Sequence, residues 1–186
     1  MSEKKGTISI HAQNIMPIIK KWLYSDKDIF VRELVSNGCD AIAKYKLLAS
    51  RGEVEAADDY AVYIEVDKEN KVMRFIDNGV GMTADEVEKY ITQVAFSGAT
   101  EFIEKYKGDK NDGDGIIGHF GLGFYSAFMA AEKVQIDTLS WQKDAQPVRW
   151  VSGDGMEYDM SERDRTTRGS TITLYMNEDS LDFLEP

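Results

Sequence analysis

The chain has 186 residues, 42% of them hydrophobic and 30% charged, which is the composition of one globular domain and excludes a disordered chain. Its net charge of −11 disfavours nucleic acid and anionic membranes as partners, and no apolar run reaches the ~20 residues that a membrane helix needs. The single cysteine, Cys39, excludes an intramolecular disulfide and predicts a reducing cytoplasm, and two distant histidines make a structural zinc site unexpected.

The first third of the chain is predicted to be helical. Residues 9–24 carry a helical apolar pattern. Residues 27–49 form a second predicted helix, which begins after several capping residues and ends at Gly52. Gly38 inside that helix costs ~1 kcal/mol relative to alanine, which suggests that another element packs closely against it.

Extended patterns and polar turns follow. Two strands are predicted at 60–67 and 72–77, and a capping box of Thr83 and Glu86 predicts a short helix that ends near residue 96. Residues 97–118 form a polar, glycine-bounded stretch, typical of a mobile lid or of a plain surface loop. A helix is then predicted at 124–131 and strands at 134–140, 147–152 and 170–176. Helices mixed with hairpin-linked strands predict an α+β sandwich with the helices on one face of the sheet, as a single domain spanning 1–186.

Four polar residues recur at helical spacing in the second helix: Glu33, Asn37, Asp40 and Lys44. At ~100° per residue they fall within about 60° of arc on one face. A solvated charged face is the ordinary interpretation of such a stripe. Because this one is narrow and bordered by apolar residues, we favour a face that lines a polar cleft. There, two carboxylates, an amide and an ammonium group can activate water, hold Mg²⁺ and contact a phosphate.

A second motif, Asp77-Asn78-Gly79-Val80-Gly81, follows a predicted strand. Asn-Gly is typical of a hairpin turn, but here a capped helix follows in place of a partner strand. We therefore favour a binding site, in which a carboxylate at a buried strand end accepts a hydrogen bond from an adenine amino group. The glycines allow the backbone to approach the ligand.

A third motif, Gly118-xx-Gly121-x-Gly123, leads into the predicted helix at 124–131, where backbone N–H groups and the helix dipole favour phosphate. No Walker lysine motif is present, which excludes an ordinary P-loop ATPase. The dinucleotide fingerprint at 113–118 follows a polar loop and not a strand, so we reject it.

Together and in this order, the three motifs resemble the ATP site shared by gyrase, sensor histidine kinases, mismatch-repair ATPases and heat-shock protein 90. Within that superfamily, residues 24–34 and 120–126 resemble the heat-shock protein 90 family, and its bacterial branch, high-temperature protein G, is the most similar. The similarity runs from about residue 8 to residue 186. It implies a Bergerat-type fold, which is a two-layer α/β sandwich with a mixed, mostly antiparallel sheet and helices on one face.

The resemblance also implies individual roles. Glu33 would be the general base that activates water, with Arg32 steering it, and Asn37 would reach the phosphates through Mg²⁺. Asp77 would bind adenine and Met82 would line the base pocket. The other residues implied to bind ATP or ADP are Asp40, Lys44, Gly81, Gly121, Gly123, Phe124 and Ser170. Residues 97–120 would form a lid over bound ATP.

For the whole protein, the resemblance implies a stress-response chaperone in the cytoplasm, whose clamp cycle on unfolded client proteins is driven by ATP binding and weak, Mg²⁺-dependent hydrolysis. The family's middle and C-terminal domains are absent from this chain, so we expect a monomer here and a homodimer at full length.

Six positions depart from the family pattern. Gly38-Cys39 stands where Ala-Ser is usual, and Tyr90, Phe96, His119 and Ser170 replace asparagine, lysine, glutamine and threonine. Two alternatives therefore remain: a DNA-linked ATPase of the gyrase or mismatch-repair type, and a nucleotide-binding module without competent hydrolysis. A sensor kinase is disfavoured because no phosphoacceptor histidine helix precedes the site.

Overall fold

The computed structural model describes residues 3–7, 28–93, 123–153 and 157–186, and its centre is a seven-stranded sheet. The strands lie in the order β1-β6-β5-β4-β7-β3-β2, and every ladder between described neighbours is antiparallel. Their bounds are β1 (Lys4–Thr7), β2 (Val62–Asp67), β3 (Val72–Asp77), β4 (Ala131–Leu139), β5 (Val148–Ser152), β6 (Glu157–Glu162) and β7 (Gly169–Met176).

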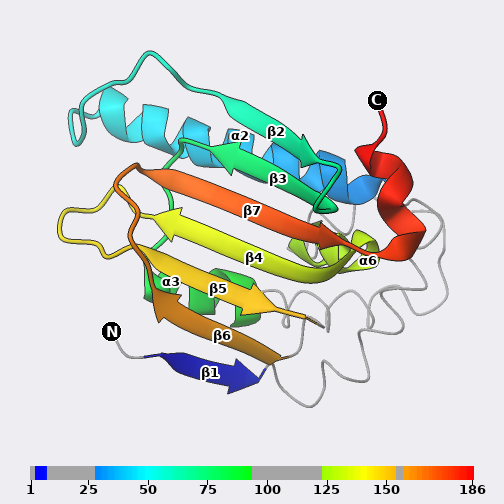
Figure 1. Ribbon diagram of the computed structural model, residues 1–186. Coiled ribbons are helices and arrows are strands. Elements are labelled where there is room, and N and C mark those ends of the chain that lie inside the picture. Colours follow the sequence, from blue (N-terminus) through cyan, green and yellow to red (C-terminus); the bar gives the residue numbers. More distant parts are fainter. Residues whose placement is uncertain (1–2, 8–27, 94–122, 154–156) are drawn as a thin grey trace, which may run out of the picture.

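Helices α2, α3 and α6 lie against one face of this sheet, behind the strands in Figure 1, and a C-terminal helix stands at the end of the sheet where β7 ends, which confirms the predicted two-layer α+β sandwich. The described helices are α2 (Ile29–Ser50), α3 (Ala84–Val87), the π-helix η1 (Glu88–Gln93), the 3₁₀ helix η2 (Gly123–Ser126), α6 (Ala127–Ala130) and the 3₁₀ helix η3 (Glu178–Leu184). None of the helices in the described part of the chain has both the length and the apolar character needed to cross a bilayer.

Aromatic side chains fill the space between the layers. Phe30, near the start of α2, meets Phe75 and Phe183 edge to face, with ring centroids 6.4 and 5.0 Å away. Phe124 of η2 meets Trp150 of β5 in the same way, at 5.8 Å. Full burial stabilises the fold by ~1.5–3 kcal/mol for each such side chain, so these contacts hold α2 and η2 against the sheet.

Most of the predicted elements are present, with their ends shifted by a few residues. The helix predicted at 27–49 is α2, and the five predicted strands are β2, β3, β4, β5 and β7. The helix predicted at 124–131 divides into η2 and α6, since β4 already begins at Ala131. Strands β1 and β6 and helix η3 were not predicted. The helix predicted at 9–24 and the lid predicted at 97–120 lie outside the described residues.

Local signals in the sequence explain where two of the helices begin or end. At the start of α3, the Glu86 N–H donates to Thr83 Oγ1 at 3.2 Å and the Thr83 N–H donates to Glu86 Oε1 at 3.0 Å, which is the predicted capping box. After α2, Gly52 adopts a φ of +76° and its N–H donates to the Ala49 carbonyl at 3.0 Å, as the predicted stop requires.

Substitution of Gly81 is expected to destabilise the fold more than substitution of Gly52. Both glycines have a positive φ, of +63° and +76°. A Cβ on Gly81 would collide with the Leu139 carbonyl, whereas a Cβ on Gly52 would meet nothing within 4 Å. We expect a loss of about 1 kcal/mol for Gly52→Ala, from backbone strain alone, and of about 3 kcal/mol or more for Gly81→Ala. Urea unfolding followed by circular dichroism measures both, and equal losses would contradict the packing at Gly81.

Candidate functional site

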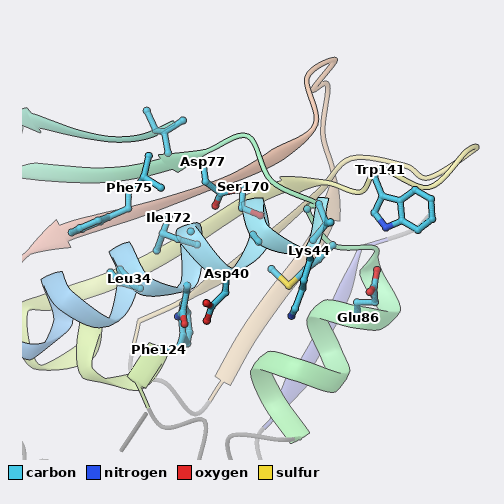
Figure 2. A pocket seen from close by; sticks show the side chains of 18 of the residues that line it. Leu34, Asp40, Lys44, Phe75, Asp77, Glu86, Phe124, Trp141, Ser170 and Ile172 are labelled. Carbon is cyan, nitrogen blue, oxygen red and sulfur yellow. The ribbon is translucent and has the colours of Figure 1, made fainter. Parts of the chain in front are cut away.

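A cavity of about 700 Å³ lies between α2 and the sheet, at the end where β3 leaves it. In Figure 2, Asp77 and Ser170 lie together beside α2, Asp40 and Lys44 project from α2, and Glu86 and Trp141 stand beyond Lys44. The other lining residues are Glu33, Leu34, Asn37, Gly38, Ala41, Leu47, Leu48, Val62, Phe75, Ile76, Val80, Gly81, Met82, Ile91, Phe124 and Ile172. The cavity is therefore largely apolar, with a few polar groups that could orient a ligand.

The polar stripe predicted on the second helix faces this cavity. Glu33, Asn37, Asp40 and Lys44 all belong to its lining, together with apolar neighbours on the same helix. Helical spacing brings these four side chains onto one wall, as the sequence predicted. Arg32 is exposed on α2 and is not among the residues that line the cavity.

On the opposite wall, Asp77 is the last residue of β3 and is only 9% exposed. Burial raises the pKa of its carboxyl group. The backbone N–H groups of Gly79 and Ser170 and the positive charges of Arg165 and Arg168 act in the opposite direction. The Gly79 N–H donates to Asp77 Oδ1 at 2.9 Å, and this hydrogen bond orients the carboxylate toward the turn that follows β3. The site thus contains a hydrogen-bond acceptor in a largely apolar recess.

The glycines after Asp77 allow α2 and the sheet to meet closely. The Val80 N–H donates to the Ala41 carbonyl at 3.1 Å, and a Cβ on Gly79 would collide with the backbone of Ala41. Gly38 lies on the same side of α2, and a Cβ there would come within 3.0 Å of the Val62 side chain. The close packing that its presence in a helix suggested is thus confirmed.

A chain of hydrogen bonds links Met82 to the strand beside Asp77. The Met82 N–H donates to Thr138 Oγ1 at 2.9 Å, and Thr138 Oγ1 lies 2.8 Å from Ser170 Oγ. Ser170 is the residue opposite Asp77 in the β3–β7 ladder. The predicted residues Met82 and Ser170 are therefore joined through Thr138, which the sequence did not single out.

Of the remaining predicted residues, some lie at the cavity and others fall outside the described part of the chain. Phe124 lines the cavity and Gly123 begins η2 immediately before it. Gly121 lies outside the described residues, as do Phe96 and His119. Tyr90 belongs to η1.

Val62, Glu86 and Trp141 are among the lining residues that the sequence did not assign to the site. Glu86 was predicted only as a cap, and Trp141 follows β4 in a segment that reads as an ordinary polar turn. The Trp141 N–H donates to the Val80 carbonyl at 2.8 Å, which fixes this turn beside the glycine motif. This hydrogen bond joins segments that are far apart in the chain, and nothing in the sequence around either residue indicates it.

Within the residues whose structure is described, no three His, Cys, Asp or Glu side chains gather in a way that could hold a metal ion. This is compatible with Mg²⁺, which is commonly held by one or two protein oxygens, several waters and the phosphates of a substrate. Asn37 provides a hard oxygen donor on the cavity wall, one helical turn from Glu33. The donor chemistry therefore fits a magnesium ion that arrives with a phosphorylated ligand.

Comparisons of the sequence with known proteins show which families it resembles over most of its length. Residues 24–171 match the family described as histidine kinase-, DNA gyrase B-, and HSP90-like ATPase. The chain is 50% identical to the chaperone protein HtpG of Bacteroides thetaiotaomicron over 183 residues, which are 98% of this chain and 26% of that protein. It is 49% identical to HtpG of Porphyromonas gingivalis over the same shares. It is 38% identical to HtpG of Francisella tularensis subsp. novicida, over 100% of this chain and 30% of that protein. The chain thus spans between a quarter and a third of the length of these curated relatives.

Asp77→Asn is expected to stabilise the folded chain at neutral pH. Because burial raises the pKa of Asp77 in the folded state, ionisation favours the unfolded chain. The gain should be largest above the raised pKa, shrink as the pH falls through it, and vanish below the ordinary aspartate pKa of ~4, where both states are protonated. Urea unfolding at a series of pH values measures it. Asp159→Asn, at a side chain that is 67% exposed, is the matched control. A gain that does not change with pH would contradict the assignment to burial.

Proposed function

The chain belongs to the family of histidine kinase-, DNA gyrase B- and HSP90-like ATPases, and we propose that it is the N-terminal, ATP-binding and weakly ATP-hydrolysing part of an HtpG-type chaperone. The observation that carries the proposal is the shared cavity, in which Asp77 lies on one wall and Glu33 and Asn37 lie on the other. An ATP molecule has an amino group at one end and a phosphate chain at the other, and the two walls complement these ends.

Adenine binds at the Asp77 end. The buried carboxylate accepts a hydrogen bond from the 6-amino group, and Met82, Val80 and Ile172 contact the faces of the ring. A hydrogen bond to a charged acceptor is strong and directional in such a recess. Gly81 and Ser170 border the same end of the cavity.

The phosphates lie toward the first half of α2. Asn37 would hold Mg²⁺, and the ion would supply positive charge that neutralises the phosphate oxygens. Glu33 orients a water molecule and accepts its proton while the water oxygen bonds to the γ-phosphorus. The bond from that phosphorus to the β–γ bridging oxygen breaks, and ADP and phosphate leave. Arg32 steers Glu33 from the neighbouring position on the helix. Asp40, Lys44, Gly121, Gly123 and Phe124 contribute the remaining contacts to the nucleotide.

In the full-length protein, ATP binding closes residues 97–120 as a lid and brings the two protomers of a homodimer together, and hydrolysis reopens the clamp around a client protein. We place this cycle in the cytoplasm. The acidic charge of −11 supports an assignment without nucleic acid. The DNA-linked ATPase is therefore the weaker candidate, and stimulation of ATP hydrolysis by duplex DNA would favour it.

Asp77→Asn is expected to weaken ATP binding at least about 100-fold, because the amide Oδ1 would remain with the Gly79 N–H and a donor would face the donor group of adenine. Isothermal titration calorimetry with ATP and Mg²⁺ measures the change. Asp159→Asn should bind ATP like the unchanged chain. Retention of the original affinity by Asp77→Asn would refute the adenine assignment.

Glu33→Ala is expected to retain ATP affinity within about twofold and to lose hydrolysis by a factor of about 10² or more, because only the transition state uses the general base. Hydrolysis is followed in the full-length protein, with binding measured separately by calorimetry. Glu65→Ala, an exposed acid on β2, serves as the matched control. Unchanged turnover in Glu33→Ala would exclude Glu33 as the base, and absence of hydrolysis in the unchanged protein would favour the binding module without catalysis.

A further inference from the structure

Arg168 connects three parts of the molecule next to Asp77. Its guanidinium carbon lies 3.6 Å from the centroid of the Tyr45 ring on α2. Its Nη2 donates to the Asn78 carbonyl at 2.8 Å, and its Nε donates to the Gly79 carbonyl at 3.0 Å. A planar guanidinium that stacks on a ring and binds two carbonyls at once has little freedom to rotate. Arg168 is therefore a rigid brace between α2 and the turn after β3.

The brace acts on the peptide group that orients the Asp77 carboxylate. The Asn78 carbonyl and the Gly79 N–H belong to the same planar peptide unit. Arg168 binds the oxygen of this unit, and the N–H of this unit donates to Asp77 Oδ1 at 2.9 Å. A tilt of the peptide plane would therefore move the donor that sets the direction of the carboxylate. Binding of a cation to the oxygen also polarises the unit and strengthens its N–H as a donor.

Other contacts keep the turn in place without Arg168. The Val80 N–H donates to the Ala41 carbonyl at 3.1 Å. The Asn78 side chain accepts from the Ala61 N–H at 3.1 Å and donates to the Asp59 carbonyl at 2.7 Å. Loss of the guanidinium is thus expected to release one peptide plane without unfolding the turn.

Gly169, the next residue, shows how closely this strand end approaches the motif. Its φ is +121°, and a Cβ there would collide with the Asp77 carbonyl oxygen. The close approach places the start of β7 directly against the last residue of β3. The Arg168 side chain therefore starts beside the turn that it binds, and its fork reaches both carbonyls.

We propose that Arg168 is a positioning residue, which sets the direction of the Asp77 carboxylate and thereby the preference of the cavity for a 6-aminopurine. The inference rests on the proposed function, since it assigns adenine to Asp77. Arg168 acts through the peptide unit and not through contact with the nucleotide. Its removal should therefore weaken the one hydrogen bond that depends on the carboxylate direction and leave the contacts with the ring faces and the phosphates intact.

The test compares ATP with purine riboside triphosphate, which has the same ring, ribose and phosphates but no 6-amino group. Calorimetry on the 186-residue chain gives the affinity ratio of the two nucleotides for the unchanged chain, Arg168→Met and Arg168→Lys. Methionine keeps an unbranched side chain against Tyr45 and lacks the donors. Lysine keeps the charge and one donor. Arg163→Met removes an exposed arginine whose guanidinium contacts only the neighbouring Glu162 carbonyl among the described hydrogen bonds, and it is the matched control.

We expect the unchanged chain and Arg163→Met to prefer ATP clearly. Arg168→Met should lose ATP affinity about 10-fold while purine riboside triphosphate binds as before, and Arg168→Lys should lie in between. If Arg168 had a purely structural role, its substitution would weaken the binding of both nucleotides equally, and that result would overturn the proposal. An unchanged ratio of the two affinities in both Arg168 variants would overturn it as well. If Arg168→Met does not fold, the ratio for Arg168→Lys decides alone. Failure of the unchanged chain to bind ATP would overturn the proposed function itself, whereas a preference for ATP that is undiminished in the Arg168 variants overturns only this inference.

Discussion

The close approach of α2 to the turn after β3 is the constraint on which the cavity depends. Val80 is hydrogen-bonded to the helix backbone at Ala41, and Gly79 lies against that backbone with no room for a side chain. This contact fixes the distance between the helix wall, with Glu33, and the sheet wall, with Asp77. A helix held further away by side chains at Gly38 or Gly79 would leave a wider gap, in which water competes for every hydrogen bond to a ligand.

The same packing makes the ionised Asp77 carboxylate unfavourable for folding, and under the proposed function it suits that carboxylate to the recognition of adenine. Burial of its carboxylate removes water, and the backbone N–H groups of Gly79 and Ser170 replace only part of that hydration. Arg165, which also contributes positive charge, is itself partly buried, and burial lowers its pKa. Burial of a charged group that lowers the stability of the fold is expected at functional sites, where residues are retained because they bind a ligand. The large apolar core around Phe30 and Trp150 stabilises the fold enough to offset the cost of burying the Asp77 carboxylate.

Local sequence predicted the parts of the fold that have local causes. The periodicity of α2, the capping box at Thr83 and the stop at Gly52 all act within one or two turns of the chain. Strands β1 and β6 were missed because Lys-Lys-Gly-Thr and Glu-Tyr-Asp-Met-Ser-Glu have few apolar residues, and their pairing with each other supplies the missing signal. Trp141 and Arg168 occupy polar turns, so only the sheet order shows that they lie beside the motif of Asp77.

The antiparallel pairing of β3 with β7 has a consequence for synthesis of the protein. Asp77 and Ser170 are opposite each other in that ladder, although about 90 residues separate them along the chain. A nascent polypeptide that has left the ribosome as far as β3 therefore carries the helix wall and the carboxylate but lacks the strand that buries them. A ligand stabilises only a conformation that can bind it, so ATP cannot assist the early steps of folding. Until β7 emerges, the apolar surfaces of α2 and β3 depend on other means of protection against aggregation.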